Sequence, residues 1–339
     1  MRDKDRKMRP YHIVAADDDR VSFAVDADVT ADALLAAAGV SKTQRKVIFE
    51  EKCLARGGAP LAAADGLDAG EAAELALREA AAEGTDLPGA AACAADILFE
   101  DAFLLCADKP AGILVHSDGT GGKTDTLTAR VRRHLEDEGR STSAQAVQRL
   151  DEDTTGCVLF SLAPEFQGGL DTLVAGHAME KLYLACVRGS LPEGPHAIAA
   201  PLGRDRHDAK RMRVSPSGKD AKTTVWGLLH RNGLTLAVVS LGTGRKHQIR
   251  VHLASEGHPI LGDALYGMRG GPAMPGYDLL PKGGHERFGL QLHCWQESFV
   301  HPVTGEKLSA TAPVPESFRS LFGGNEIERA LAAWESRKR

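Results

Sequence analysis

The chain has 339 residues, of which 43% are hydrophobic and 26% are charged, values typical of a folded globular protein long enough for about two domains. The net charge of −5 lies in the N-terminal part, because residues 1–95 hold 12 Lys and Arg against 17 Asp and Glu, whereas the remaining residues hold 29 of each. These values exclude a peptide-sized binder and a disordered chain. Because the net charge is negative, binding to a polyanion would have to use a local basic segment.

No membrane segment and no metal site are expected. The charged start at residues 1–10 is not followed by an apolar core, and no run approaches the roughly 18 apolar residues of a membrane span. The six cysteines contain no Cys-x-x-Cys pattern, which argues against both zinc and a disulfide framework. We therefore expect a monomeric cytoplasmic protein with neither metal nor cofactor.

After an N-terminal extension (residues 1–20), residues 21–79 are predicted to form a small unit. A short apolar helix over residues 32–38 is followed by Ser41 and Gln44, whose capping-box spacing predicts a second helix. A hairpin is expected across residues 53–61. Three basic residues share one face of the second helix: Lys42, Arg45 and Lys46.

The Ala-rich segment at residues 80–95 predicts a linker with few contacts. Residues 96–325 are predicted to form a large domain, and residues 326–339 a C-terminal helix or tail. Strands are expected at residues 97–99, 103–107, 158–160, 181–187 and 234–241. Helices are expected at residues 125–138, 168–175 and 327–334. Strand hairpins mixed with helices predict an α+β domain with a largely antiparallel sheet.

The segment after Gly244 has an ambiguous periodicity, because Ile249, Val251 and Leu253 alternate as in a strand. The Gly-His-Pro sequence at residues 257–259 is a strong helix stop and favours a helix. In a helix, Arg250 would lie in the first turns and could reach a neighbouring loop. We predict that Arg250 is the counter-ion of Asp151, which lies in such a loop.

The decapeptide at residues 147–156, Val-Gln-Arg-Leu-Asp-Glu-Asp-Thr-Thr-Gly, ties an arginine and a carboxylate to an apolar run that then turns. Arg149 and Asp151 are two residues apart and would point to the same side of extended backbone. Asp151 is thus a candidate nucleophile, and an ordinary turn or capping aspartate is the alternative.

Three separated motifs together resemble the RluA-type pseudouridine synthases, which isomerise uridine in ribosomal or transfer RNA. They are Asp108-Lys109-Pro110-Ala111-Gly112, Arg149-Leu150-Asp151-x-x-Thr154 and Gly244-Arg245-Lys246-His247-Gln248-Ile249-Arg250. The resemblance covers roughly residues 96–318. It implies a pseudouridine synthase fold, with a long curved mixed sheet, flanking helices and an active-site cleft across the middle of the sheet.

The same resemblance implies roles for individual residues. Asp151 would attack the anomeric carbon of the ribose or carbon 6 of uracil, and Arg149 would brace the space that the flipped nucleotide leaves. Tyr183 would stack on the base and act in proton abstraction from carbon 5. Leu292 would line the uracil pocket. Plain core packing is the alternative for Tyr183 and Leu292.

Two residues depart from the family pattern. Gln148 stands where the family usually has His, and Thr155 stands where it has Ser. Gln keeps a hydrogen-bonding side chain and Thr keeps a hydroxyl, so the geometry of the site could survive both changes.

RNA is the expected partner, and two basic segments are candidates for binding it. One corresponds to the family's basic loop region and contains Arg204, Arg206, Lys210, Arg211 and Arg213. The other is the basic helix face in residues 21–79, a unit that resembles the αL RNA-binding module of the small-subunit ribosomal protein four type. The alternatives are a solvated charged loop and a small helical cap that does not touch RNA.

Two other functions compete with uridine isomerisation. Asp151 and Asp153 could be a glycosidase pair, but two residues apart on one strand they cannot readily flank a sugar from opposite faces. A catalytically silent RNA-binding factor of ribosome assembly is the second alternative. The joint presence of Asp151, Tyr183 and Arg250 favours the enzyme, with ribosomal RNA favoured over transfer RNA.

Overall fold

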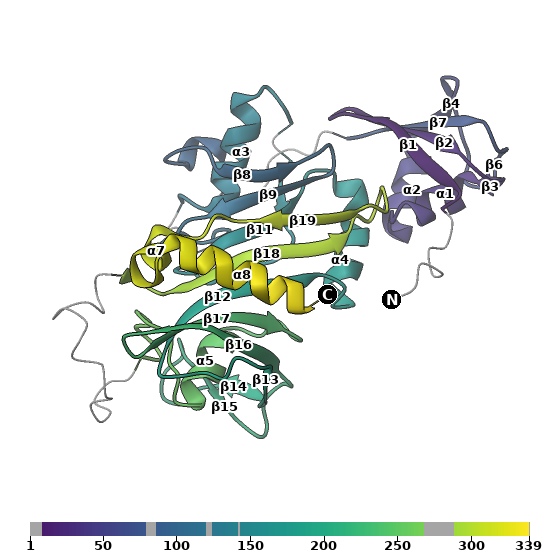
Figure 1. Cartoon of the computed structure of the whole chain (residues 1–339). Helices are drawn as coiled ribbons and strands as arrows, with labels where there is room; N and C mark the ends of the chain where they lie inside the picture. The colour runs from purple at the N-terminus through teal and green to yellow at the C-terminus, as the bar shows by residue number, and fades with distance from the viewer. Residues whose placement is uncertain (1–8, 79–85, 120–123, 142, 268–287, 339) are drawn as a thin grey trace.

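The computed structural model describes residues 9–78, 86–119, 124–141, 143–267 and 288–338. It contains a small N-terminal unit and a large domain built on one long sheet (Figure 1). None of the helices in these ranges combines the length and apolar character that a membrane span requires.

The N-terminal unit is a five-stranded antiparallel sheet with two helices. In spatial order its strands are β1 (Tyr11–Ala16), β2 (Arg20–Val25), β7 (Ala72–Ala76), β4 (Leu54–Arg56) and β5 (Ala59–Pro60). A separate pair, β3 (Val29–Thr30) and β6 (Gly66–Leu67), and the helices α1 (Ala31–Ala37) and α2 (Lys42–Glu50) complete it. The Ser41 side chain caps α2 by accepting a hydrogen bond from the Gln44 N–H, as its sequence predicts.

In the part of the chain that the structure describes, the large domain contains a ten-stranded sheet in which only β11 and β18 pair in parallel. Its central path is β13 (His196–Ala199), β16 (Lys222–Arg231), β17 (Leu234–Leu241), β12 (Glu180–Arg188), β18 (Leu292–Val300), β11 (Thr155–Ser161), β9 (Leu104–Lys109) and β8 (Asp96–Glu100). Strand β10 (Gln145–Ala146) pairs with β11, and β19 (Lys307–Thr311) pairs with β18. The prediction of a largely antiparallel mixed sheet is confirmed.

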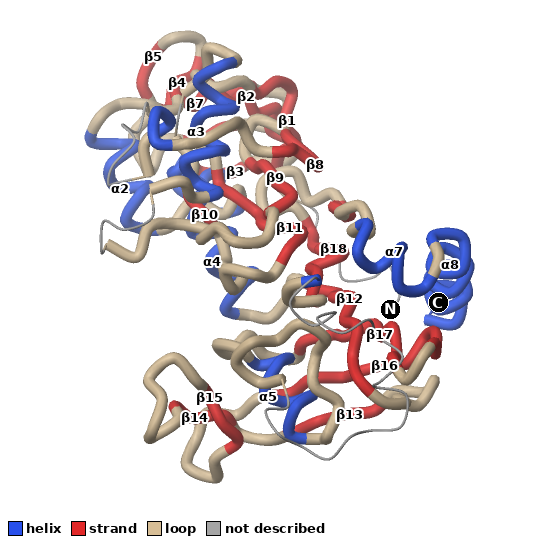
Figure 2. Tube along the Cα trace, turned by 90° about the vertical axis from the view of Figure 1, so that its left-hand side faces the viewer, coloured by secondary structure: helices blue, strands red, loops and turns tan. Residues whose placement is uncertain are grey.

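Helices cover both faces of this sheet. They are α3 (Leu127–Asp137), α4 (Gln167–Ala175), α5 (Gln248–Ser255), α7 (Glu316–Phe322) and α8 (Gly324–Lys338). Figure 2 shows α7 and α8 on one side and α4 and α5 on the other. Alternate residues of β12 serve the two sides, since Leu182 and Leu184 pack in the cluster with α7 and α8, whereas Tyr183 belongs to the opposite cluster.

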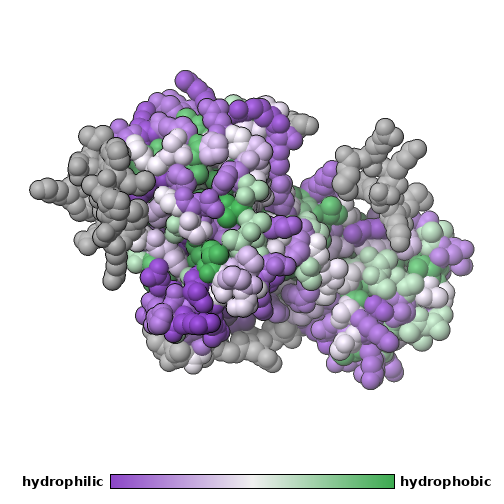
Figure 3. Space-filling model, turned by 90° about the horizontal axis from the view of Figure 1, so that it is seen from below, coloured by the Kyte–Doolittle hydropathy of each residue, from purple (hydrophilic) through white to green (hydrophobic). Residues whose placement is uncertain are grey.

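A separate hairpin, β14 (Leu202–Arg204) and β15 (Met212–Val214), lies at the end of the molecule opposite the N-terminal unit (Figure 1). Seen from the hairpin side, the surface is mostly hydrophilic, with apolar residues in small groups (Figure 3). The described residues also contain two short 3₁₀ helices, η1 (Pro88–Ala90) and η2 (Pro164–Phe166).

The predicted boundary at residue 20 falls inside the β1–β2 hairpin, so residues 11–20 are part of the N-terminal sheet rather than an extension. The predicted linker also differs from the structure. Residues 79–85 lie outside the described ranges, but the Asp86 carboxylate accepts hydrogen bonds from the Thr126 hydroxyl at 2.6 Å and the Ser117 N–H at 2.9 Å. Asp86, within the predicted linker, is therefore held to Ser117 and to Thr126, the N-cap residue of α3.

The N-terminal unit packs closely against the large domain. Gly168 in α4 permits this contact, because a Cβ there would lie 2.8 Å from the Cβ of Ser41. The Tyr11 hydroxyl donates to the Val303 carbonyl at 2.7 Å. Buried apolar residues of both parts belong to one continuous cluster.

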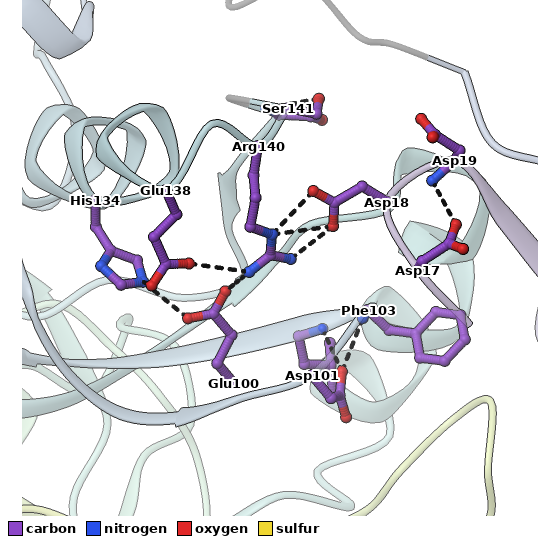
Figure 4. A network of polar contacts seen from close by, with 12 residues as sticks. Asp17, Asp18, Asp19, Glu100, Asp101, Phe103, His134, Glu138, Arg140 and Ser141 are labelled. Atoms are coloured by element: carbon purple, nitrogen blue, oxygen red, sulfur yellow. Dashed lines mark hydrogen bonds and ion pairs between the residues drawn. The ribbon is translucent and has the colours of Figure 1, made fainter. Parts of the chain in front are cut away.

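Two ion pairs also cross this boundary. Arg78 donates to the fully buried Glu165 carboxylate at 2.9 Å. Arg140 bonds to Asp18, in the turn between β1 and β2, at 2.7 Å and also pairs with Glu100 on β8 (Figure 4). The two parts are therefore joined by ion pairs as well as by apolar packing.

Candidate active site

A cavity of about 910 Å³ opens on the α5 side of the sheet. Its wall includes all five residues that the sequence assigns to the active site: Arg149, Asp151, Tyr183, Arg250 and Leu292. They come from the loop before β11, from β12, from α5 and from β18, and only the fold brings them together.

Asp151 lies in a tight turn at the cavity wall, where the Thr154 N–H donates to the Asp151 carbonyl. Its side chain is 24% exposed, which leaves the carboxylate accessible from the cavity. The turn leads into β11, whose second residue, Gly156, has a φ of +103°. A Cβ at this position would lie 2.1 Å from the Cys294 carbonyl oxygen, so β18 can approach the turn only because residue 156 is glycine.

Arg250 in α5 contacts Asp151, as predicted. Its Nη1 donates to Asp151 Oδ2 at 3.0 Å, while Nε and Nη2 donate to the two oxygens of Asp263 at 2.8 Å each. The guanidinium thus holds the accessible carboxylate in place while a second, fully buried carboxylate fixes the guanidinium.

Asp263 is a site residue that the sequence reasoning missed. Burial alone would raise its pKa, but Arg250 and the N–H groups of Tyr266 and Leu265 keep that pKa below its usual value. Its position three residues before Tyr266 in a turn gave no signal of an arginine partner thirteen residues earlier.

Tyr183 and Leu292 lie on neighbouring strands beneath the cavity. Tyr183 pairs with Cys294, and Leu292 pairs with Ala185. Both side chains are buried, and burial raises the pKa of Tyr183 well above its usual value, so the phenol keeps its proton at neutral pH. Arg149 is exposed at the cavity wall.

Gln148 and Thr155, the two departures from the family pattern, both keep hydrogen bonds. The Thr155 hydroxyl bonds to His293 Nδ1 at 2.8 Å. Gln148 Nε2 donates to both carboxyl oxygens of Glu297, at 2.6 and 2.7 Å. Burial raises the pKa of Glu297, a residue that the sequence did not mark because β18 was not predicted.

Lys109 supports the turn from behind although it does not line the cavity. Its side chain is fully buried, and Nζ donates to the carbonyls of Glu152 at 2.6 Å and Pro110 at 2.8 Å. Burial lowers the pKa of Lys109 to about 8, although the charges of Asp153, Glu152 and Asp151 oppose this shift.

This lowered pKa predicts a pH-dependent stability. The folded chain releases the Lys109 proton near pH 8, whereas an unfolded lysine does so near about 10.4. Between these values the unfolded chain binds more protons, so the contribution of Lys109 to the free energy of unfolding rises with pH. In denaturant unfolding, the free energy of unfolding of the wild type minus that of Lys109→Met should therefore increase from about pH 8 to about pH 10. A difference that stays flat over this range would contradict the shift.

The basic residues around the β14–β15 hairpin have different surroundings. Arg204, Arg206 and Lys210 are exposed, and Lys210 lines the cavity. Arg211 and Arg213 are half-buried.

The structure does not bring Lys42, Arg45 and Lys46 to the cavity, because α2 lies near the opposite end of the molecule (Figure 1). Lys42 and Lys46 are exposed, whereas Arg45 turns to Asp32 and donates to its carboxylate at 2.7 Å.

Among the described residues, one group has the types and spacing of metal ligands: Glu100, His134 and Glu138. Arg140 pairs with both carboxylates, so a protein cation already balances them (Figure 4). This group lies outside the cavity wall.

Comparison with known proteins identifies the family. The family model described as RNA pseudouridylate synthase matches residues 103–255. The chain is 38% identical over 229 residues to the uncharacterized RNA pseudouridine synthase YhcT of Bacillus subtilis, covering 67% of this chain and 70% of that protein. The chain belongs to the RNA pseudouridine synthase family. The predicted membership and reaction class, isomerisation of uridine in RNA, are thereby confirmed.

Two further relatives of this pseudouridine synthase are informative. The ribosomal large subunit pseudouridine synthase D of Xanthomonas campestris is 35% identical over 252 residues, covering 72% of this chain and 73% of that protein. The solved structure of human RNA pseudouridylate synthase domain containing 4 has a TM-score of 0.54 at 24% identity, covering 66% of this chain and 90% of that one. The latter likeness supports the fold.

Proposed function

We propose that this pseudouridine synthase modifies ribosomal RNA of the large subunit, with Asp151 as its nucleophile. The observation that carries the assignment of Asp151 is its accessible carboxylate, bound to Arg250 in a cavity that Tyr183 and Leu292 also line. The choice of RNA is supported by relatives named for the large ribosomal subunit.

The reaction begins with a nucleotide that leaves its stack and enters the cavity, which costs a few kcal/mol. Arg149, exposed at the cavity wall, is placed to brace the space left in the RNA. A base that fills the cavity expels water and disfavours an ionised nucleophile, and Arg250 offsets that penalty for Asp151.

Asp151 then forms a covalent bond to the uridine, and the glycosidic bond from nitrogen 1 breaks. The uracil rotates in the cavity and rejoins the ribose through carbon 5. The proton at carbon 5 leaves, nitrogen 1 gains a proton, and Asp151 is released as a carboxylate, so the isomerisation consumes no co-substrate. Tyr183, on the strand beneath the cavity, stacks on the base and takes part in the transfer of the carbon 5 proton.

The basic β14–β15 hairpin beside the cavity binds the phosphate backbone of the substrate, and the exposed lysines of α2 extend this contact. The enzyme acts as a monomer in the cytoplasm.

Mapping of pseudouridines in total RNA from a deletion strain tests this function. Uridine in place of pseudouridine at one or more large-subunit positions, restored by the wild-type gene but not by an Asp151→Asn gene, is the expected result. An unchanged ribosomal map with a lost transfer RNA modification would overturn the choice of RNA. Restoration by the Asp151→Asn gene would overturn the proposed nucleophile.

Tyr183→Phe should lower turnover far more than RNA affinity. The ring keeps its stacking surface, but the hydroxyl needed for proton transfer is lost. Single-turnover rates at saturating enzyme, compared with binding of the same RNA, separate the two effects. Equal losses in rate and affinity would indicate a structural role for Tyr183 instead.

A further inference from the structure

Tyr266 connects the β14–β15 hairpin to the active site. It lies in the turn after α5 and is 7% exposed. Its hydroxyl accepts a hydrogen bond from the Met212 N–H at 2.7 Å, and it lies 2.7 Å from His247 Nδ1. Met212 belongs to β15, and His247 is the N-cap residue of α5.

The Tyr266 ring makes the same connection through its face. The guanidinium carbons of Arg211 and Arg250 lie 5.3 and 5.2 Å from the ring centroid, within the range of cation–π interaction. Arg211 belongs to the hairpin segment, whereas Arg250 is the counter-ion of Asp151. The hydroxyl and the ring of Tyr266 thus each contact one residue of the hairpin segment and one residue that lies beside Asp151.

His247 carries the connection to the nucleophile itself. It has φ +56° and ψ 20°, a left-handed conformation that is costly for a residue other than glycine, and its side chain does not cap α5. The side chain is instead turned inward, 9% exposed, with Nε2 lying 3.8 Å from Asp151 Oδ1. This left-handed conformation places the imidazole beside Asp151 Oδ1, the carboxylate oxygen to which Arg250 does not donate.

The direction of the hydrogen bonds follows from the donors. The Met212 N–H can only donate, and burial raises the pKa of Tyr266, so the phenol keeps its proton and can donate it to His247 Nδ1. Burial also lowers the pKa of His247, which favours the neutral ring. The remaining ring proton then sits on Nε2, facing Asp151.

We infer that Tyr266 and His247 are positioning residues that couple the seating of the β14–β15 hairpin on RNA to the orientation of Asp151. The inference rests on the proposed role of Asp151. The separation of 3.8 Å is longer than a hydrogen bond, so closure by about 1 Å is needed for Nε2 to donate to the carboxylate. RNA that draws the hairpin inward supplies this closure through Tyr266, and Asp151 is then held from both oxygens.

The first test is Tyr266→Phe, which keeps the ring for both guanidiniums and removes only the hydroxyl. Loss of one net hydrogen bond in the reacting state should slow the single-turnover rate roughly tenfold, with RNA affinity changed less than about twofold. Tyr11→Phe is the matched control, because it also removes a buried hydroxyl but at the N-terminal unit. A wild-type rate for Tyr266→Phe, or an equal loss for Tyr11→Phe, would overturn the inference.

A second pair of variants covers the case in which Tyr266→Phe does not fold. The Gln side chain can place an N–H near the position of Nε2, whereas the shorter Asn side chain reaches only the position of Nδ1. His247→Gln should therefore keep a faster single-turnover rate than His247→Asn, at similar RNA affinity. Equal rates for the two variants would contradict a donor role for Nε2.

A spectroscopic readout distinguishes failure of this inference from failure of the proposed function. The ¹⁵N shifts of His247, assigned with the His247→Gln variant, should show the neutral Nε2–H tautomer in the wild-type protein and lose it in Tyr266→Phe. The opposite tautomer would overturn the coupling even if Asp151 is the nucleophile. Full activity of Asp151→Asn would overturn the proposed function whatever the tautomer.

Discussion

Asp151→Asn is expected to abolish isomerisation while leaving RNA affinity within about twofold of wild type. The amide has nearly the same shape and can still accept a hydrogen bond from Arg250, but it cannot act as the nucleophile. Release of tritium from RNA labelled at carbon 5 of uridine measures the reaction directly, and filter binding measures affinity.

Asp153→Asn provides the control for this variant. Asp153 lies two residues further along the same turn and is exposed, and among the described residues Arg250 donates to Asp151 and Asp263 rather than to Asp153. The Asp153→Asn variant should therefore retain activity. This result would also exclude a catalytic pair of Asp151 with Asp153. Tritium release at the wild-type rate by pure Asp151→Asn would show that Asp151 is not the nucleophile. Equal losses of activity in both variants would indicate that the reaction depends on the conformation of the turn rather than on the Asp151 carboxylate alone.

The sequence predicted the pairing of Asp151 with Arg250 because both residues lie in motifs with strong local signals. The helix stop at residues 257–259 favoured a helix with Arg250 in its first turns, and the structure has that helix at residues 248–255. Asp263 and Glu297 were missed for a different reason. Each is buried against a partner that only the tertiary fold supplies, Arg250 for the first and Gln148 for the second.

The strands that the sequence missed show where local propensity misleads. Strand β7 consists of Ala, Glu and Leu, all strong helix formers, yet its residues pair with β2 and β4 in the N-terminal sheet. Strand β16 contains Gly227, which interrupts a strand pattern. In the fold the strand passes Gly227 with an irregular register, and a Cβ there would lie 2.6 Å from the Leu191 carbonyl oxygen.

A protein that starts near Ala92 is expected to fold poorly, contrary to what the linker composition alone suggests. Removal of the N-terminal unit exposes the apolar cluster that both parts share and leaves Glu165 without Arg78. Each apolar side chain returned to water costs about 1.5–3 kcal/mol, and a domain has only about 5–15 kcal/mol of stability in total. We expect an insoluble product or a thermal midpoint at least about 10 °C lower. A truncated protein with the wild-type midpoint would show that the two parts are energetically independent.

Because truncation would confound folding with binding, substitutions of exposed lysines test whether the N-terminal unit touches RNA. Lys42 and Lys46 are exposed on α2, whereas Arg45 is committed to Asp32. If both lysines contact phosphates, the double variant Lys42→Ala/Lys46→Ala should bind RNA more weakly, and the slope of log affinity against log salt should fall by about 0.7–0.9 per lost contact. Lys307→Ala, an exposed lysine on β19, is the control and should leave the slope unchanged. Superimposable slopes for the double variant and wild type would mean that RNA does not reach α2, and that the unit serves the enzyme through the core it shares with the catalytic sheet.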